Sequence, residues 1–229
     1  MKNRDSRGFT LLELLITISI IGIMSVLVMA NFQYGRRANE LRRAGTELLQ
    51  NLRLAQGYTT GGNSIKYCEG GSIPQPNAFK PCADDTYCAP NSCITSVPLG
   101  GYGIHLESTG SYLLFGDTTK NQFYDDSNVD AAILLKDISI KGLYILQFKL
   151  GNGVALAPSP INPLDITFEP PNGDIHFYLH QVPAVDGDGD LINTLDLLVQ
   201  SNFVTENCRK ISINRISGQI SEVQNPCSL

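Results

Sequence analysis

The distribution of hydrophobic residues divides the chain into an apolar start, an amphipathic continuation and a β-patterned remainder. From Phe9 to Ala30 almost every residue is apolar, and Glu13 is the one ionisable side chain in this run. An apolar stretch of about 20 residues is long enough to cross a bilayer as a helix. The leader before it, MKNRDSRG, is mainly basic, and positive charge before a first span keeps that end in the cytoplasm. The pattern predicts one membrane span at residues 9–30, with the rest of the chain on the outer side.

A cleaved secretory signal peptide is the alternative interpretation of this run. The apolar core of such a peptide is about 7–15 residues long and is followed by a small-x-small cleavage site. The run here is longer, and the next residues, NFQYGRRANELRRAGTELLQNLRLAQ, continue a helical pattern. These features favour a span that stays in the protein.

The amphipathic continuation, residues 31–60, places small and apolar residues on one helical face. They recur at spacings of four and three, the period of an α-helix, at Tyr34, Ala38, Leu41, Gly45, Leu48, Leu52 and Ala55. The other face carries Arg36, Arg37, Glu40, Arg42, Arg43, Glu47 and Arg53. We expect helix to about Gln56, broken by Gly57–Gly62, with its apolar stripe packed on a head domain. The arginines suggest DNA or anionic lipid as a partner, but a solvated face is favoured because the remaining chain is acidic.

Beyond residue 61 the hydrophobic period changes to that of β-strands. Candidate strands are Tyr102–Glu107, Tyr112–Phe115, Ile133–Ile140, Tyr144–Leu150, Leu164–Phe168, Asp174–Leu179, Leu195–Val199, Lys210–Arg215 and Gln219–Val223. Asn172-Gly173 and Ser217-Gly218 are typical hairpin turns. The expected fold class is α+β: a long N-terminal helix, half of it transmembrane, packed on a mostly antiparallel β-sheet head at residues 61–229.

Composition narrows the function classes. Hydrophobic residues make up 42% of the chain, which is enough for a core and excludes wholesale disorder. The 17 Lys and Arg residues against 22 Asp and Glu residues give a net charge of −5, the wrong sign for a generic nucleic-acid binder. No nucleic-acid partner is expected.

The N-terminus carries a recognisable motif. A basic leader ending in Gly8, followed by Phe9-Thr10-Leu11-Leu12-Glu13-Leu14, resembles the class III signal of type IV pilins and pseudopilins. The resemblance implies that residues 1–8 are a leader, removed by a prepilin peptidase between Gly8 and Phe9, and that Phe9 is then N-methylated. It also implies an inner-membrane, single-pass protein that an assembly platform joins to other pilin or pseudopilin subunits in a filament.

Glu13 is the informative residue of the span, because a carboxylate in an apolar run is costly unless it has a partner. Cleavage before Phe9 creates an ammonium one helical turn away. Glu13 is expected to pair with that group in its own chain or in a neighbouring subunit during assembly. Ala30 stands where many members of the family have a helix-kinking proline, so a straighter helix is expected here.

The head resembles the same family more faintly. The segments LDITFEPPNGDIHFYL (164–179) and RKISINRISGQISEV (209–223) look like the paired hairpins of H-type minor pseudopilins. This favours a minor subunit for protein secretion, with a type IV pilus and a DNA-uptake pseudopilus as open settings. The alternative is a membrane-anchored extracytoplasmic binding or hydrolytic domain that does not polymerise.

All six cysteines follow the span, which indicates an oxidising compartment. Cys208 and Cys227 flank the last hairpin and resemble the C-terminal disulfide loop of many pilins, which implies that they pair. Two further disulfides are expected among Cys68, Cys82, Cys88 and Cys93, in a stretch too polar to build a core. Zinc is the alternative there, but the spacing lacks a tight C-x2-C pair.

The acidic run VDGDGDLIN presents Asp186, Asp188 and Asp190 at alternate positions, as at the start of a calcium loop. The expected sixth-position glycine and twelfth-position glutamate are absent, so a solvated turn is the competing interpretation.

No catalytic motif is visible. His176 and His180 fall four residues apart, on one face of a candidate strand, and no carboxylate motif completes a metal site around them. The chain is expected to be a structural subunit and not an enzyme.

Overall fold

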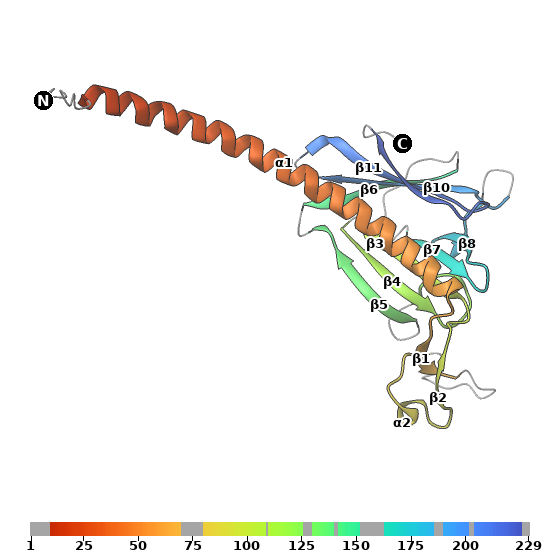
Figure 1. Ribbon diagram of the computed structural model, residues 1–229. Helices are drawn as coiled ribbons and strands as arrows, with labels where there is room; N and C mark the ends of the chain where they lie inside the picture. The colour runs from red at the N-terminus through yellow and green to blue at the C-terminus, as the bar shows by residue number, and fades with distance from the viewer. Residues whose placement is uncertain are drawn as a thin grey trace, which may run out of the picture.

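The computed structural model describes residues 10–69, 80–108, 110–125, 130–139, 142–151, 163–185, 190–201 and 204–225. Helix α1 (Leu11–Thr60) is 50 residues long. It extends away from a β-rich head over its first half and packs along that head over its second half (Figure 1). The α+β fold class, with a long apolar N-terminal helix on antiparallel sheets, is therefore confirmed.

The head is built from twelve strands and a one-turn helix in the described residues. They are β1 (Ile65–Cys68), α2 (Asp85–Cys88), β2 (Cys93–Ser96), β3 (Gly101–Ser108), β4 (Ser111–Asp117), β5 (Ala131–Asp137), β6 (Leu143–Leu150), β7 (Leu164–Glu169), β8 (Asp174–Leu179), β9 (Val182–Pro183), β10 (Thr194–Ser201), β11 (Val204–Asn214) and β12 (Ile220–Asn225). All nine predicted strands are present. The sequence prediction missed β1, β2, β9 and α2, which are too short to show a clear period.

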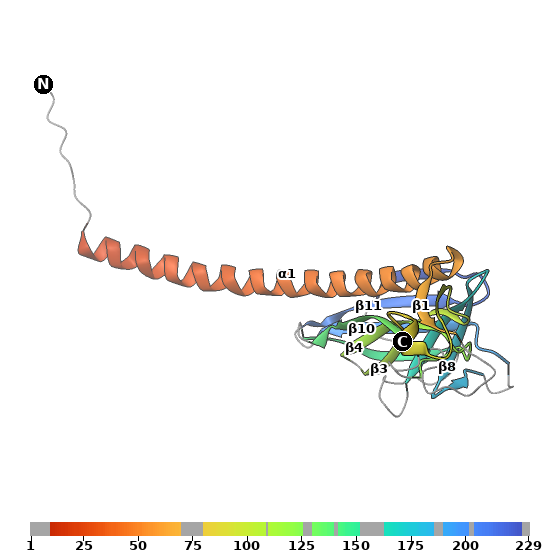
Figure 2. The ribbon, with the colours of Figure 1, turned by 90° about the horizontal axis from the view of Figure 1, so that it is seen from below.

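The strands form two large antiparallel sheets and a small one. One large sheet has the order β5-β4-β3-β7-β8-β9, the other has the order β12-β11-β10-β6, and β1 pairs with β2. Helix α1 lies across strands of both large sheets (Figure 2). One hydrophobic core joins the helix to the inward-facing side chains of both sheets.

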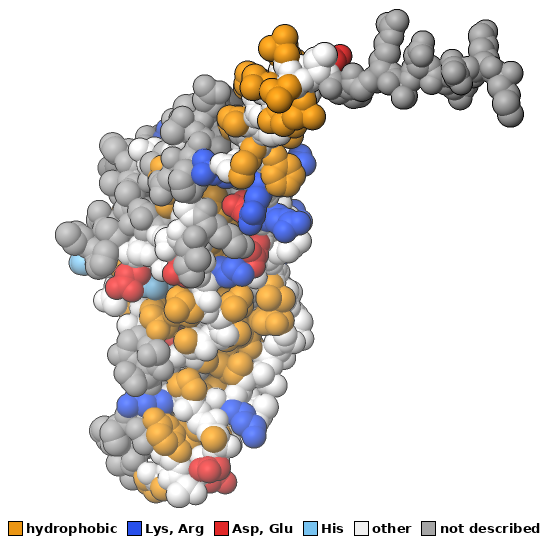
Figure 3. All heavy atoms as spheres, turned by 90° about the vertical axis from the view of Figure 1, so that its left-hand side faces the viewer, with side chains coloured by type: hydrophobic (Ala, Val, Ile, Leu, Met, Phe, Trp, Pro, Cys, Tyr) orange, Lys and Arg blue, Asp and Glu red, His pale blue; other side chains and the backbone are white. Residues whose placement is uncertain are grey.

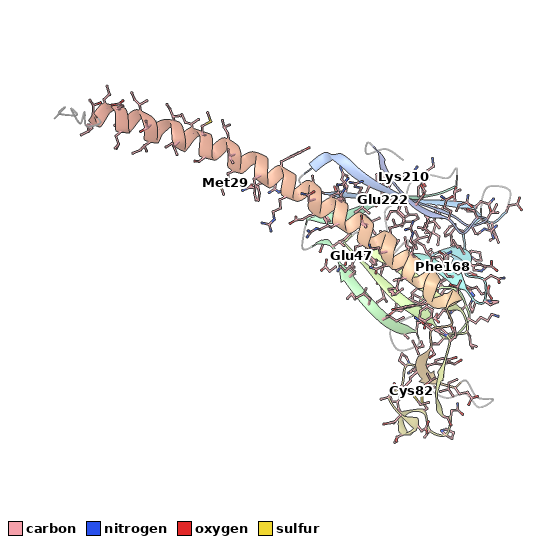
Figure 4. The ribbon with its side chains drawn as sticks, in the orientation of Figure 1. Met29, Glu47, Cys82, Phe168, Lys210 and Glu222 are labelled. Atoms are coloured by element: carbon pink, nitrogen blue, oxygen red, sulfur yellow. A yellow bond between two sulfur atoms is a disulfide. The ribbon has the colours of Figure 1, made fainter. Side chains whose placement is uncertain are left out.

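The helical stripe predicted from the sequence is buried only where the head reaches it. Leu41, Leu48, Leu52 and Ala55 are at most 2% exposed, whereas Tyr34 is 52% exposed. In Figure 4, Met29 lies well away from the head, while Phe168 and Glu222 lie beside the second half of the helix. The helix therefore has one half that belongs to the head and one half without a partner in the described chain.

Helix α1 ends later than predicted. Gly57, expected to break it, lies inside the helix, and Gly61 is the cap, with its N–H donating to the Gly57 carbonyl at 2.8 Å. The Thr59 hydroxyl donates to the Phe168 carbonyl at 3.0 Å and accepts from the Tyr102 N–H at 3.1 Å. These contacts hold the last turn on the six-stranded sheet and outweigh a glycine penalty of about 1 kcal/mol. The helix is also unbroken across residue 30, as expected without a proline there.

Gly45 marks the closest approach of α1 to the four-stranded sheet. A Cβ at this position would lie 2.9 Å from Arg209 Cβ and 3.0 Å from Glu222 Oε1. Arg209 Nε lies 3.6 Å from Glu222 Oε1, and the Thr46 hydroxyl donates to Glu222 Oε2 at 3.3 Å. The missing side chain at Gly45 thus lets the helix pack directly against this partly buried ion pair.

We expect Gly45→Ala to destabilise the head and Gly35→Ala, its matched control, to leave the head unchanged or slightly stabilised. Both substitutions improve helix propensity by about 1 kcal/mol. Only Gly45→Ala forces Arg209 and Glu222 to move, at an overpacking cost of about 1–3 kcal/mol, because a Cβ at Gly35 meets nothing within 4 Å. Denaturant unfolding of both full-length variants in detergent measures the difference. Equal midpoints for the two variants would contradict this packing.

Candidate functional site

The first turn of α1 fixes the position of the Glu13 carboxylate. Thr10 is the N-cap, and its hydroxyl accepts a hydrogen bond from the Glu13 N–H at 3.3 Å. The Glu13 side chain in turn accepts from the Thr10 N–H, with Oε2 at 3.5 Å. This reciprocal pair is a capping box, in which two backbone donors of the first turn are satisfied by side chains. The carboxylate is therefore held at the N-terminal end of the helix, where the helix dipole favours negative charge.

The capping box was missed in the sequence analysis, although its signal, Thr10-x-x-Glu13, was visible there. Gly8 and Phe9, the predicted processing residues, lie outside the described residues. The structure thus describes one of the two predicted assembly groups, Glu13.

The apolar half of α1 is unpartnered. Every described side chain from Leu11 to Met29 is exposed, as is Phe32. Among the described residues, α1 is the one helix with a stretch long and apolar enough to cross a membrane. An apolar surface of this length is stable only in lipid or against other apolar helices.

A disulfide-bonded lobe projects from the head near the end of α1, on the far side of the molecule from the N-terminus (Figure 1). It contains β1, α2 and β2. Disulfides join Cys68 to Cys88 and Cys82 to Cys93, and the backbone of Cys68 pairs with that of Cys93 across the two strands. At the base of the lobe, Ile65 packs against the core of the head. Tyr67 is 2% exposed, and its hydroxyl donates to the Val97 carbonyl at 3.4 Å.

The zinc interpretation of these cysteines does not fit the structure. The sulfurs of Cys68, Cys82 and Cys88 do lie within 4.8 Å of one another. A zinc site needs thiolates, and all three sulfurs are held in disulfides.

Cys208, at 1% exposure on β11, is disulfide-bonded as well. Its predicted partner, Cys227, lies outside the described residues.

The candidate calcium run lies mostly outside the described residues. Asp186 and Asp188 belong to the part that is not described, and Asp190 is exposed. A β-bridge between Val185 and Leu191 closes the base of this run. The calcium interpretation stays a prediction.

A buried polar pair, unnoticed in the sequence, lies on the outer face of the six-stranded sheet. His105 on β3 and Asp165 on β7 are directly opposite in register, and His105 Nδ1 lies 2.7 Å from Asp165 Oδ1. Tyr124 packs on the imidazole with its ring centroid 4.8 Å away, and its N–H donates to the same carboxylate oxygen. Burial raises the pKa of Asp165, and the hydrogen bond from His105 opposes that shift.

His105 borders a groove of about 300 Å³ that is also lined by Ser111. A Ser–His–Asp catalytic unit requires a serine hydroxyl bonded to the other imidazole nitrogen. The Ser111 hydroxyl instead bonds to the Ser108 hydroxyl at 2.8 Å. The pair is therefore a cross-strand contact that holds Tyr124 against the sheet. Its geometry does not form a Ser–His–Asp hydrolytic unit.

The loop after β4 is held by two further buried carboxylates. Asp117 accepts hydrogen bonds from the backbone N–H groups of Thr119, Lys120 and Gln122. Asp130 accepts from the N–H groups of Thr118 and Asp125. In a sheet, these backbone N–H groups would donate to carbonyls of a neighbouring strand. In this loop, which folds back over the sheet, they donate to the two carboxylates instead. Burial raises the pKa of Asp117, and it raises the pKa of Asp130 to about 7.

We expect the head to lose stability as the pH rises from about 4 to about 7. The folded chain keeps a proton on Asp130 up to about pH 7, whereas the unfolded chain releases it near 4, so the folded state binds more protons in this window. Asp130 alone should then lower the free energy of unfolding by up to ~1.4 kcal/mol per pH unit. The raised pKa values of Asp117 and Asp165 add to this slope in the same direction.

Denaturant unfolding across this pH range measures the slope. Asp130→Asn should make the slope shallower, while Asp174→Asn, at an exposed position, should not. A wild-type stability that rises throughout the window would contradict the assignment.

The expectation that His176 and His180 lie on one face of a strand was wrong. β8 ends at Leu179, so His176 lies in the strand and His180 lies in the following turn, with a φ of 55°. His176 Nε2 is 3.1 Å from Glu169 Oε2 on the neighbouring strand. Because the strand ends before His180, the two histidines do not share a strand face.

Comparison with known proteins finds a match to a known motif at the N-terminus. The family model of the prokaryotic N-terminal methylation motif matches residues 3–29. This range contains the predicted processing junction and most of the apolar run. No curated protein and no solved structure matches the chain. The motif, placed at the start of a long apolar helix on antiparallel sheets, supports a type IV pilin-like protein that is a prepilin-peptidase substrate.

Proposed function

We propose that the chain is a minor pilin or pseudopilin, a structural subunit of a type IV filament-type machine that serves protein secretion. The observation that carries this proposal is the methylation motif on a helix whose first half has no partner in its own head. A domain that only needed an anchor would require the span but not the motif. An assembling subunit requires both, because its exposed helix packs against other helices once it leaves the lipid.

Processing prepares the helix for assembly. The prepilin peptidase cuts between Gly8 and Phe9 on the cytoplasmic side and methylates Phe9, while the head lies outside the inner membrane. The cut places a new ammonium directly before the Thr10 cap. The capping box already holds the Glu13 carboxylate at this end of the helix. Glu13 can then pair with its own Phe9 ammonium or with that of a neighbouring subunit, which sets the axial register between helices.

The head supplies the outward surface. Its disulfide-bonded lobe lies far from the N-terminus, so it faces away from the membrane when the helix is embedded. The assembly platform of the inner membrane and the other subunits are the expected partners. Asp186, Asp188 and Asp190 are the candidate calcium residues. If they bind the ion, a chelator should lower the midpoint of thermal unfolding, and an unchanged midpoint would contradict calcium binding.

A strain lacking this chain tests the machine it serves. We expect release of extracellular proteins to fall, while filament retraction and DNA uptake stay unchanged. Loss of retraction-driven motility alone would assign the chain to a type IV pilus, and loss of DNA uptake alone would assign it to a competence pseudopilus. The membrane-anchored domain that does not polymerise would be favoured if the deletion leaves all three activities intact and if sheared filaments of the parent strain lack the chain.

A further inference from the structure

A cluster of arginines follows the apolar half of α1 directly. Phe32 and Tyr34, which are 72% and 52% exposed, separate the apolar run from Arg36. Aromatic side chains in such positions are typical of the membrane–water interface. At 1.5 Å per residue, the Arg36 backbone lies about 9 Å beyond residue 30. Figure 3 shows the Lys and Arg side chains of this region gathered next to the hydrophobic side chains of the span.

Arg36 and Arg43 share a face of the helix that the head does not cover. They are seven residues apart, or two turns, and lie opposite the buried stripe that contains Leu41 and Leu48. Their side chains border a shallow groove of about 550 Å³, which is lined by Phe32, Gly35, Arg36, Asn39, Glu40 and Arg43. The groove is thus apolar at its membrane end, and along its length it carries two arginines and one glutamate, Glu40.

The described chain neutralises little of the positive charge of Arg36, Arg42 and Arg43. In this stretch of the sequence they stand against one glutamate, Glu40. Glu40 binds Arg36, with Oε1 3.3 Å from Nε, but that arginine side chain is 74% exposed, and such surface pairs contribute little. Glu47, the next acidic residue, is bound by Lys136. Arg42 and Arg43 are exposed, with no ion-pair partner among the residues that the structure describes.

The direction of the side chains places this charge near the membrane. Cα–Cβ bonds in an α-helix tilt toward the N-terminus, which here is the membrane end. Arginine stems can therefore reach back along the helix while their charged ends meet lipid phosphates. Clusters of basic residues next to a span are attracted to anionic lipids over about one Debye length.

We propose that Arg36 and Arg43, together with Phe32, bind the headgroups of anionic phospholipids at the outer surface of the membrane that holds α1. This contact keeps the head of the unassembled subunit close to the membrane. It is released when the helix is drawn into a filament. The proposal requires the apolar half of α1 to be in lipid, but it does not require assembly.

A single fluorophore in the groove tests this proposal. The chain contains no tryptophan, so Asn39→Trp places the one tryptophan between the two arginines. The full-length variant is reconstituted into nanodiscs of brominated phosphatidylcholine, either alone or mixed equally with brominated phosphatidylglycerol. We expect stronger quenching and bluer emission in the anionic discs, and we expect high salt to remove both effects.

Charge-matched variants identify the residues responsible. In every variant the span stays in the disc, so the quantity compared is the ratio of molecules whose arginine segment contacts the lipid surface to molecules whose segment does not. Adding R36Q and R43Q should lower this ratio about 30-fold, at about 1 kcal/mol for each arginine. Adding K66Q and K80Q instead removes the same charge from the disulfide-bonded lobe and should change nothing. Equal quenching in neutral and anionic discs would overturn the proposal, and so would an equal loss in both double variants.

Discussion

Replacing Glu13 with glutamine should remove the chain from filaments while leaving its processing and its folded head intact. Glutamine at this position of a capping box can still accept from the N-cap backbone, so the first turn of α1 should persist. What the substitution removes is the charge that opposes the Phe9 ammonium. An ion left without its partner in an apolar setting costs about 3–5 kcal/mol. Incorporation should therefore fall by about 100-fold or more, as measured by the amount of chain in sheared filaments.

Thr10→Ala is the matched control for this experiment. It removes the other half of the capping box, at a cost of about 1 kcal/mol, but leaves the Glu13 carboxylate in place. If Glu13 acts by charge, Thr10→Ala should still enter filaments and Glu13→Gln should not. If both variants are incorporated normally, or if Thr10→Ala is the more defective one, the assembly role of Glu13 is contradicted.

Removing the two disulfides of the lobe should unfold the lobe and leave the rest of the head folded. The lobe consists of two four-residue strands and one helical turn, which is too little structure to fold alone. Each native disulfide of a small domain contributes about 2–5 kcal/mol. The fully buried core of the head draws on α1 and the two large sheets and includes no lobe residue, so it should survive the loss.

Limited proteolysis measures this effect. In a variant with Cys68, Cys82, Cys88 and Cys93 all changed to serine, we expect rapid cleavage between residues 65 and 98 and a persistent core fragment. Cys208→Ser provides the control, because its disulfide lies on β11 and its loss should leave the lobe resistant. A four-serine variant with wild-type resistance would show that packing, and not the disulfides, holds the lobe.

The sequence was sufficient where the determining pattern is local. The apolar run and the four-three spacing around Leu41, Leu48 and Leu52 are properties of neighbouring residues. They predicted α1 except for its last turn, and they predicted the part of its stripe that the head buries. The strands with regular alternation were found for the same reason.

The sequence was insufficient where distant segments decide the structure. The pairing of His105 with Asp165 depends on the register between β3 and β7, which no local pattern reveals. β1 and β2 are short and are stabilised by disulfides whose pairing the sequence left open. The last turn of α1 extends past Gly57 because Thr59 bonds to both neighbouring strands. The Glu13 capping box is different, because its signal, Thr10-x-x-Glu13, is local and visible in the sequence. It was missed because Glu13 was interpreted through the cost of a charge in an apolar run.

The central claim is that this chain is processed and assembled as a filament subunit, and the mass of its mature form tests that claim most directly. The intact protein is isolated from its own membrane in cells with and without the prepilin peptidase. We predict a chain that begins at N-methylated Phe9 when the peptidase is present and at Met1 when it is absent. A chain that begins at Met1 in both cells, or at a residue beyond Ala30, would contradict the account.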